Sequence, residues 1–278
     1  MTTDLSVATD LGVLRATVVG AGPPAVLWHS MFVDSHSWER VVPTLSTRRT
    51  LILVDAPSCG RSDPLDRAAD IAACADAASV VVDEVCSRYG VDRVDWLGNA
   101  WGGHVGMHLA ATRAAAIRSL VAISAPTFPI DDSLRQKIRL LKPLYRLIGP
   151  RGPVRSAIED GILTEHTRAT DPEAVAVLRD ALAASGKHMI TAIDTAILNR
   201  TDLAWAARAI TCPTLFIATE DRGEWSLDQA QAVVDTMTGA VATTVLAARV
   251  IPALEQPAET AQKISAFWNR IDEGQDHR

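Results

Sequence analysis

Residues 96–104 have the composition of a sharp turn that presents one reactive side chain. The stretch reads Trp-Leu-Gly-Asn-Ala-Trp-Gly-Gly-His, and Gly98 and Gly102 stand two residues before and after Ala100. A nucleophile on a strained strand-to-helix turn needs small neighbours at these two positions, so the spacing is typical of a nucleophile turn. Alanine, however, has no lone pair with which to attack a carbonyl carbon. The spacing therefore predicts the geometry of nucleophilic catalysis without its nucleophile.

The elements around this turn alternate between strands and helices. Apolar, strand-like runs cover residues 13–20, 24–30, 50–57, 92–100 and 117–126. Helical spacing covers residues 68–89 and 101–114. Strands that alternate with helices favour a mostly parallel sheet with helices on both faces. The glycine-flanked turn then lies between a strand and a helix, as a nucleophile turn requires.

The alternation stops over residues 127–209, where no strand-like run occurs. Helices are predicted there instead, including one that Asp171 would cap and Pro172 would open. Strand-like and helical runs return over residues 212–221, from 226, over 242–249 and over 257–270. This pattern predicts a core made of residues 1–126 and 210–278 and a helical cap made of residues 127–209.

One predicted cap helix is basic. Its apolar residues share a helical stripe, namely Leu134, Ile138, Leu141 and Leu144. Basic residues occupy other positions of the same helix, namely Arg135, Lys137, Arg139, Lys142 and Arg146. Such a helix either meets an anionic substrate or has a solvated charged face.

Four segments resemble the α/β-hydrolase superfamily, of the kind with one domain and a cap. LWHSMFVDSHSWERVVPTL resembles its oxyanion segment and the following helix, and LVDAPSCGRSD resembles its Asp-x-Pro-Gly-x-Gly-x-Ser loop. CPTLFIATEDRGEW resembles the strand that carries the triad acid, and VLAARVIPALEQPAETAQKISAFW resembles the segment of the triad histidine. The segments follow the family's order, with the helical stretch where a cap is usually inserted. The resemblance implies an α/β-hydrolase fold, with a mostly parallel central sheet, helices on both faces and a helical cap.

Carried over position by position, the resemblance leaves two places of the triad without their chemistry. The nucleophile place, usually serine, holds Ala100, and the histidine place holds Val250. The acid place matches Asp221. Valine neither accepts nor returns a proton, and triad members act as a unit. We therefore expect no serine-based hydrolysis and no esterase turnover.

Other positions also depart from the family pattern. Arg249 stands where glycine is usual, and Ser30 and Ser58 replace glycines of two loops. The two serines either add hydrogen-bond donors to the pocket wall or are substitutions that the backbone tolerates. Cys59 stands where the family often has histidine. No base is evident beside it, so we expect an inert buried thiol.

Three explanations fit the degenerate triad. An engineered Ser→Ala change at position 100 accounts for Ala100 but leaves Val250 unexplained. A non-catalytic protein would use the pocket to bind a small molecule or would serve as a scaffold. A non-hydrolytic enzyme of the lyase, isomerase or cyclase type needs an oxyanion hole and a positioned acid or base, but no covalent nucleophile. We favour the third explanation over the second.

Backbone donors support this preference, because they survive the loss of the serine hydroxyl. By resemblance, the N–H groups of Trp101 and of Met31 or Ser30 form the oxyanion hole. Such donors stabilise an enolate or alkoxide as well as a tetrahedral intermediate. We expect a small, largely apolar, carbonyl-type molecule beside Ala100 and Val250 beneath the cap. The Trp101 indole either stacks against this molecule or packs under the cap.

Asp221 and Asp34 are the candidates for acid–base chemistry. Asp221 either pairs with Arg249, in place of the missing Asp–His pair, or is a solvated loop acid. Asp34 and His36 either line the pocket entrance or form a solvated turn with an aspartate cap. His29 either reaches the pocket floor, where it would contact a substrate, or ties loops together, which we favour.

Composition argues against several classes of partner. The 278 residues carry a formal net charge of −6, whereas general nucleic-acid binding usually requires a basic surface. No apolar run approaches the roughly 20 residues of a membrane-spanning helix, and no signal-peptide pattern opens the chain. Four scattered cysteines without metal spacing predict reduced thiols. We expect a cytoplasmic protein with a small-molecule partner and no metal, organic cofactor, nucleic-acid partner or membrane partner. The oligomeric state does not follow from the sequence.

Overall fold

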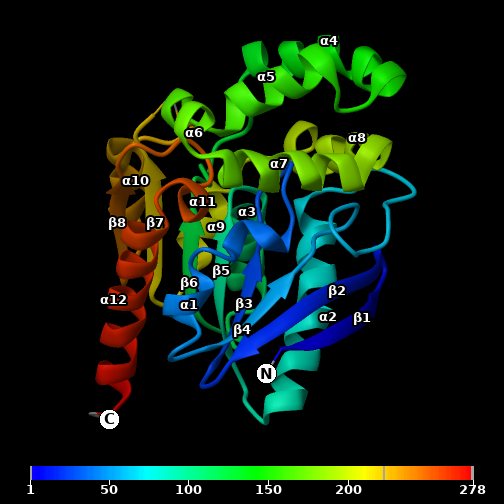
Figure 1. The fold of residues 1–278 in the computed structure, drawn as a ribbon. Coiled ribbons are helices and arrows are strands. Elements are labelled where there is room, and N and C mark those ends of the chain that lie inside the picture. The colour runs from blue at the N-terminus through cyan, green and yellow to red at the C-terminus, as the bar shows by residue number, and fades with distance from the viewer. Residues whose placement is uncertain (1, 222, 277–278) are drawn as a thin grey trace.

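One eight-stranded sheet forms the centre of the computed structural model, which describes residues 2–221 and 223–276 (Figure 1). Its strands are β1 (Thr3–Thr9), β2 (Gly12–Gly20), β3 (Pro24–Trp28), β4 (Thr50–Val54), β5 (Val94–Asn99), β6 (Ile117–Ile123), β7 (Thr214–Thr219) and β8 (Ala240–Val245). Their order in the sheet is β1-β2-β4-β3-β5-β6-β7-β8. β2 is antiparallel to both β1 and β4, and all the other pairs are parallel. The prediction of a mostly parallel sheet is confirmed.

Two features of the sheet were not predicted from the sequence. β1 was missed, because its alternation of buried Leu5 and Val7 with polar residues is short. β2 and β3 follow one another in the chain but do not pair, since β4 lies between them. Strand order depends on contacts between distant segments, which local patterns do not report.

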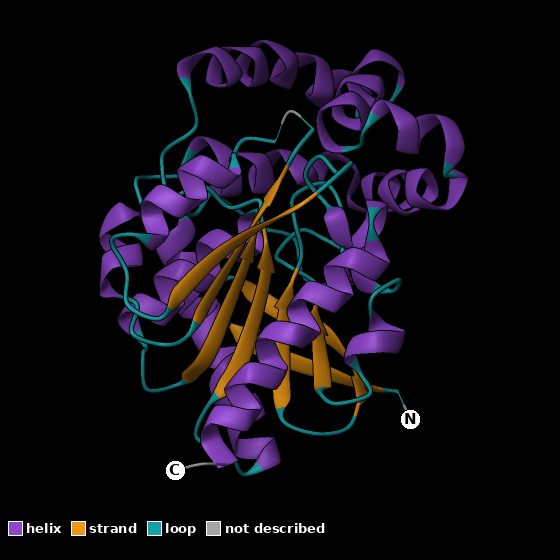
Figure 2. Cartoon of the chain, turned by 90° about the vertical axis from the view of Figure 1, so that its left-hand side faces the viewer, coloured by secondary structure: helices purple, strands orange, loops and turns teal. Residues whose placement is uncertain are grey.

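Helices cover both faces of the sheet (Figure 2). Within β3, Val26 and Trp28 belong to one apolar cluster, whereas Ala25 and Leu27 belong to the cluster on the opposite side. α2 (Ile71–Tyr89) and α3 (Trp101–Thr112) contribute to the first cluster, and α12 (Pro257–Asp276) contributes to the second. All five residues of β3 are buried, as expected for a parallel strand that is covered on both faces.

Only helices and loops occur between β6 and β7. The helices of this stretch are α4 (Asp132–Ile148), α5 (Gly152–Ile162), α6 (Glu165–Thr170), α7 (Pro172–Ser185), η2 (Gly186–His188), α8 (Met189–Ile193), η3 (Asp194–Leu198) and α9 (Ala204–Ala209). α7 begins as predicted, because the Asp171 side chain accepts a hydrogen bond from Ala174 N at 3.0 Å. Figure 1 shows α4 to α8 beyond one end of the sheet. Whether residues 127–209 form a separate unit stays a prediction.

Short helices complete the chain. They are η1 (Ser35–Trp38) and α1 (Val42–Leu45) after β3, α10 (Leu227–Val234) after β7, and α11 (Pro252–Glu255) after β8. Across the described residues, no helix combines the length and apolarity needed to cross a membrane.

Candidate functional site

Ala100 lies at the apex of a tight turn between β5 and α3. Its backbone angles are φ 45° and ψ −102°, a conformation that residues with a side chain rarely adopt. A Cβ atom on Gly98 would overlap the backbone of Gly102, and one on Gly102 would overlap the Trp28 carbonyl. The strand, turn and helix predicted around residues 98–102 are therefore present, with alanine at the apex.

Backbone N–H groups without acceptors lie on both sides of this turn. Trp101 is the first residue of α3, and Ser30 and Met31 lie in the loop after β3. Within the described part of the chain, no acceptor is hydrogen-bonded to these three N–H groups. The loop and the turn are neighbours, because the rings of His29 and Trp101 meet edge to face at 6.5 Å. Donors from two elements are thus available at one place.

Asp221 and Arg249 form an ion pair. Arg249 Nη2 lies 3.1 Å from Asp221 Oδ2, and Arg249 Nε donates to the Asp221 carbonyl at 3.3 Å. The arginine is 5% exposed, and its Nη1 also donates to the carbonyl of Asp160 in α5. The contact predicted between Asp221 and Arg249 is confirmed, and its role in place of an Asp–His pair stays a prediction.

Val250 is held against the turn by the residue before Ala100. Asn99 Nδ2 donates to the Val250 carbonyl at 2.9 Å and to the Ile123 carbonyl at 3.2 Å. Thr219 Oγ1, at the end of β7, donates to the Arg249 carbonyl. Asn99 and Thr219 were missed from the sequence, because neither has a family motif or a spacing that would single it out. Together these bonds bring the segment after β8 beside the ends of β5 and β7.

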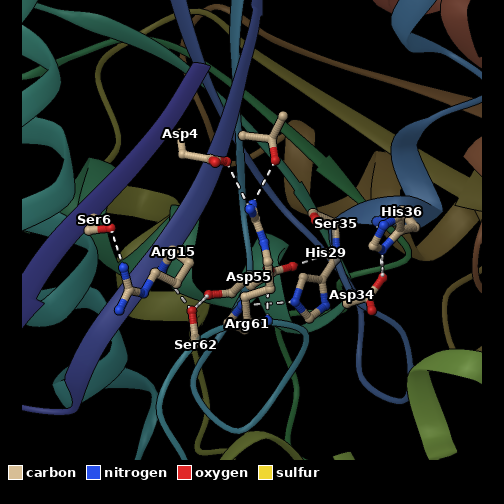
Figure 3. Close-up of polar contacts among 12 residues, drawn as sticks. Asp4, Ser6, Arg15, His29, Asp34, Ser35, His36, Asp55, Arg61 and Ser62 are labelled. Atoms are coloured by element: carbon tan, nitrogen blue, oxygen red, sulfur yellow. Dashed lines mark hydrogen bonds and ion pairs between the residues drawn. The ribbon is translucent and has the colours of Figure 1, made fainter. Parts of the chain in front are cut away.

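His29 is buried and uses both ring nitrogens (Figure 3). Ala56 N donates to Nε2 at 2.8 Å, so Nδ1 carries the proton that is donated to the Ser30 carbonyl at 2.6 Å. Burial lowers the pKa of His29 below its ordinary value and keeps the ring neutral. These bonds join the loops after β3 and β4, which agrees with the structural role that we favoured.

Asp34 and His36 form a hydrogen-bonded pair at the start of η1. Asp34 Oδ1 accepts from His36 N at 3.0 Å and faces His36 Nδ1 at 2.8 Å. The aspartate is buried, whereas the His36 side chain is 59% exposed. Burial alone would lower the pKa of His36, but the hydrogen bond and the charge of Asp34 outweigh it and raise this pKa. The aspartate cap expected here is present, and no described residue bonds to Asp34 Oδ2.

The buried Asp55 connects the loop after β3 to the loop after β4, a role that was not predicted from the sequence. Its carboxylate accepts from Ser35 N at 3.0 Å and from Arg61 N at 3.1 Å (Figure 3). The Arg61 side chain continues to Asp4 at 2.8 Å, which connects the loop after β4 to β1. The loop that carries Asp34 is therefore fixed by a charged group from the next strand.

The remaining site residues have structural contacts. Cys59 is buried, and burial raises the pKa of its thiol, which agrees with an inert cysteine. Ser58 has φ 66°, and its Oγ accepts from Leu65 N at 2.8 Å. The Trp101 ring is buried and packs edge to face against Trp28 at 6.1 Å.

Two further observations concern metal ligands and cavities. Among the described residues, no group of three or more His, Cys, Asp or Glu side chains could hold a metal ion. A groove of about 720 Å³ opens elsewhere, between residues 10–12, residues 63–70, Ala73 and Asn199, and Ala100 does not line it. The expected ligand pocket beside Ala100 stays a prediction.

Comparison with known proteins agrees with this geometry. A model of the alpha/beta hydrolase family matches residues 25–263. The chain belongs to this family. Structures with the same fold include a thermophilic esterase from Thermogutta terrifontis, at 20% identity and TM-score 0.85 over 97% of this chain and 99% of that one. An enol-lactonase from Burkholderia xenovorans LB400 matches at 19% identity and TM-score 0.85, over 95% of this chain and all of that one. At these identities the likeness shows the fold alone.

Proposed function

We propose that this member of the α/β-hydrolase family is a non-hydrolytic enzyme. In this proposal, the turn at Ala100 polarises the carbonyl group of a small, largely apolar molecule. The main support is that the turn keeps its left-handed φ of 45° although alanine offers no nucleophile. Such a backbone costs about 1–3 kcal/mol, persists where the surrounding structure holds it, and clusters at functional sites. In this proposal, the turn at Ala100 is used to hold the N–H groups of Trp101 and Met31 toward the carbonyl oxygen of the substrate.

The proposed chemistry is proton removal from the carbon next to the carbonyl. A base takes the proton, the C–H electron pair moves into the C–C bond, and the carbonyl oxygen gains the negative charge of an enolate. Two backbone N–H donors stabilise this charge more than that of the neutral ketone. Where the enolate is conjugated with a C=C bond, return of the proton to the far carbon of that bond makes the enzyme an isomerase. Departure of a leaving group from the carbon next to the deprotonated one makes it a lyase.

The Asp34–His36 pair is the proposed proton acceptor. Asp34 Oδ2 has no bonded partner among the described residues, and His36 already holds the other oxygen at 2.8 Å. Proton transfer by a positioned side chain contributes about 10²–10⁴-fold to a rate. Asp221 is the weaker candidate, because the buried guanidinium of Arg249 already pairs with its carboxylate.

A specific observation favours a second function, binding of a carbonyl-type ligand without turnover. Both candidate acids have structural partners, since Asp221 pairs with Arg249 and Asp34 caps η1. If these contacts are their whole role, the N–H donors hold a ligand and no residue moves a proton.

Proton exchange in heavy water tests the enzyme proposal without knowledge of the full reaction. The protein is incubated in D₂O with a panel of small ketones, diketones and lactones, and loss of the α-proton signal is followed by NMR. We expect protein-dependent exchange that is saturable in substrate. In D34N it should fall by about 10²-fold or more, because the amide keeps the cap but is no base.

The matched control is D70N, at the aspartate that caps α2 and accepts from Ala73 N at 2.8 Å. It replaces a capping carboxylate away from the site and should leave exchange unchanged. Saturable binding with no exchange would support the binder instead. Ester cleavage that stays with the purified wild-type protein would contradict both functions.

A further inference from the structure

The outer face of α4 exposes an apolar stripe. Leu140 is 78% exposed and Leu147 is 75% exposed, and seven residues apart they lie on the same side of the helix. Pro143, between them, is exposed as well. The opposite side is anchored by Tyr145, which is buried and donates to the Gly186 carbonyl at 2.9 Å. The two leucines therefore point away from the fold.

Free basic side chains flank this stripe on both sides. At about 3.6 residues per turn, Arg139 and Arg146 lie on one side of the leucines and Lys137 lies on the other. All three are exposed, and none has a hydrogen-bond or ion-pair partner among the described residues. The other two basic residues of α4 are engaged, Lys142 with Asp194 at 2.5 Å and Arg135 with the Leu198 carbonyl.

The charge of α4 is opposite to that of the whole chain. Five basic residues and one acidic residue, Asp132, give the helix a formal net charge of +4, whereas the chain carries −6. Figure 1 shows α4 and α5 at the outer limit of the molecule, beyond α7 and α8. A flat surface can therefore approach the leucines and their basic flanks together.

We propose that the outer face of α4 docks on an anionic lipid surface. Shallow insertion of a helix needs a few large apolar side chains on one face and cations beside them, which meet the anionic headgroups. Two leucines and one proline make a small apolar stripe, whereas a stable protein interface buries roughly 800 Å² per partner. Its size thus favours a lipid surface over a stable protein interface, and two copies of the basic α4 that faced each other would repel.

This inference is independent of the proposed function. It revises the expectation of no membrane partner, which rested on the lack of a spanning segment, because docking on a surface requires none.

Sedimentation with vesicles tests the proposal on the full chain. Vesicles of phosphatidylcholine alone or with about one third phosphatidylglycerol are mixed with the protein at low and high salt. We expect binding to the anionic vesicles at low salt, and loss of that binding at high salt. R139Q/R146Q should weaken binding by about tenfold or more, since each cation near the surface contributes about fivefold. L140Q/L147Q should weaken it by a similar factor.

Each test variant has a control that replaces the same number of residues of the same type outside α4. R88Q/R93Q removes two exposed arginines at the end of α2 and before β5, and L227Q/L246Q removes two exposed leucines outside α4. Both should change binding less than about twofold, and far-ultraviolet circular dichroism checks that every variant is folded. Absence of binding to anionic vesicles would overturn the proposal, as would an equal loss in the controls. A dimer that L140Q/L147Q dissolves, without vesicle binding, would assign the stripe to a second copy.

Discussion

At Ala100 the backbone has the geometry of a nucleophile turn but carries no nucleophile. The residues at the other two triad positions bond to groups outside a triad. The segment of the expected histidine presents a Val250 carbonyl to Asn99, and the expected acid Asp221 is neutralised by Arg249. A hydroxyl added at position 100 would find valine at the place of the triad histidine and a triad acid that is already paired with Arg249. The loss of hydrolysis is thus spread over several residues.

A100S is therefore expected to gain no esterase activity. With a short p-nitrophenyl ester, its rate should stay within about tenfold of the wild-type background, because a serine without the triad histidine lacks most of the triad's effect. A100S/V250H restores two of the three members and is the informative comparison. A rise of 10³-fold or more in A100S alone would show that alanine had replaced a working serine.

His104 makes the stability of the protein depend on pH. It is buried, and burial together with the charge of Arg200 lowers its pKa well below the ordinary value. The unfolded chain binds a proton near pH 6.5 that the folded chain does not, so stability is present above pH 6.5 and is lost below it. The loss can reach about 1.4 kcal/mol per pH unit for this group.

We expect H104Q to flatten the decline of the unfolding free energy between pH 6.5 and 5. Urea unfolding at several pH values measures this decline. H36Q is a control in which the pH dependence should change in the opposite direction. The pKa of His36 is raised, so His36 stabilises the fold at acid pH and loses this effect as pH rises through its folded pKa. Equal slopes for wild type and H104Q would contradict the assignment.

Between elements, Arg249 and Glu255 connect the segment after β8 to the cap helices. Glu255 accepts from Thr164 N at 2.7 Å and from Arg249 N at 2.8 Å, and Arg249 donates to Asp160 in α5. In R249A we expect faster hydrogen exchange, by about tenfold or more, at the end of α5 and the start of α6. K263A breaks a half-buried pair with Glu259 within α12 and should leave that exchange unchanged. Unchanged protection in R249A would mean that packing alone holds the cap helices.

A buried charge network joins β5, β6, α12 and Arg49, which lies just before β4. Asp95 is fully buried, and it accepts from Arg49 Nε at 2.9 Å and from Ser119 Oγ at 2.6 Å. D95N removes the buried carboxylate with which both Arg49 and Arg118 pair and leaves these two cations to share Asp272, so it should reduce the unfolding free energy by about 3–5 kcal/mol. D83N breaks an exposed pair and should change it by less than about 1 kcal/mol. Similar values for both variants in urea unfolding would contradict this explanation.

What the sequence predicted at this scale depended on local signals. Hydrophobic period and glycine spacing located the helix after Ala100 and the turn itself, because both are set by neighbouring residues. The partner of Arg249 was inferred from a family position rather than from spacing. The role of Asp55 escaped prediction, since its contact with Ser35 forms only when β3 and β4 lie side by side.

Across the whole molecule, one apolar cluster includes both the sheet and the helices inserted after β6. Trp28 and Trp96 of the sheet share it with Leu178 and Leu182 of α7. A helical stretch that shares its core with the sheet loses most of its stabilisation when that core opens. The cap helices and the sheet should therefore unfold in one cooperative transition.

Two probes distinguish this from stepwise unfolding. Six of the seven tryptophans are buried in the core, so their fluorescence follows the sheet, whereas far-ultraviolet circular dichroism follows all the helices. We expect the two urea transitions to coincide. L178A should lower the unfolding free energy that each probe reports by the same amount, about 2–5 kcal/mol, because it opens a cavity in the shared cluster. A dichroism phase that precedes the fluorescence change would contradict the shared core. In that case the inserted helices would melt on their own, and residues 127–209 would be an independent unit rather than part of one fold.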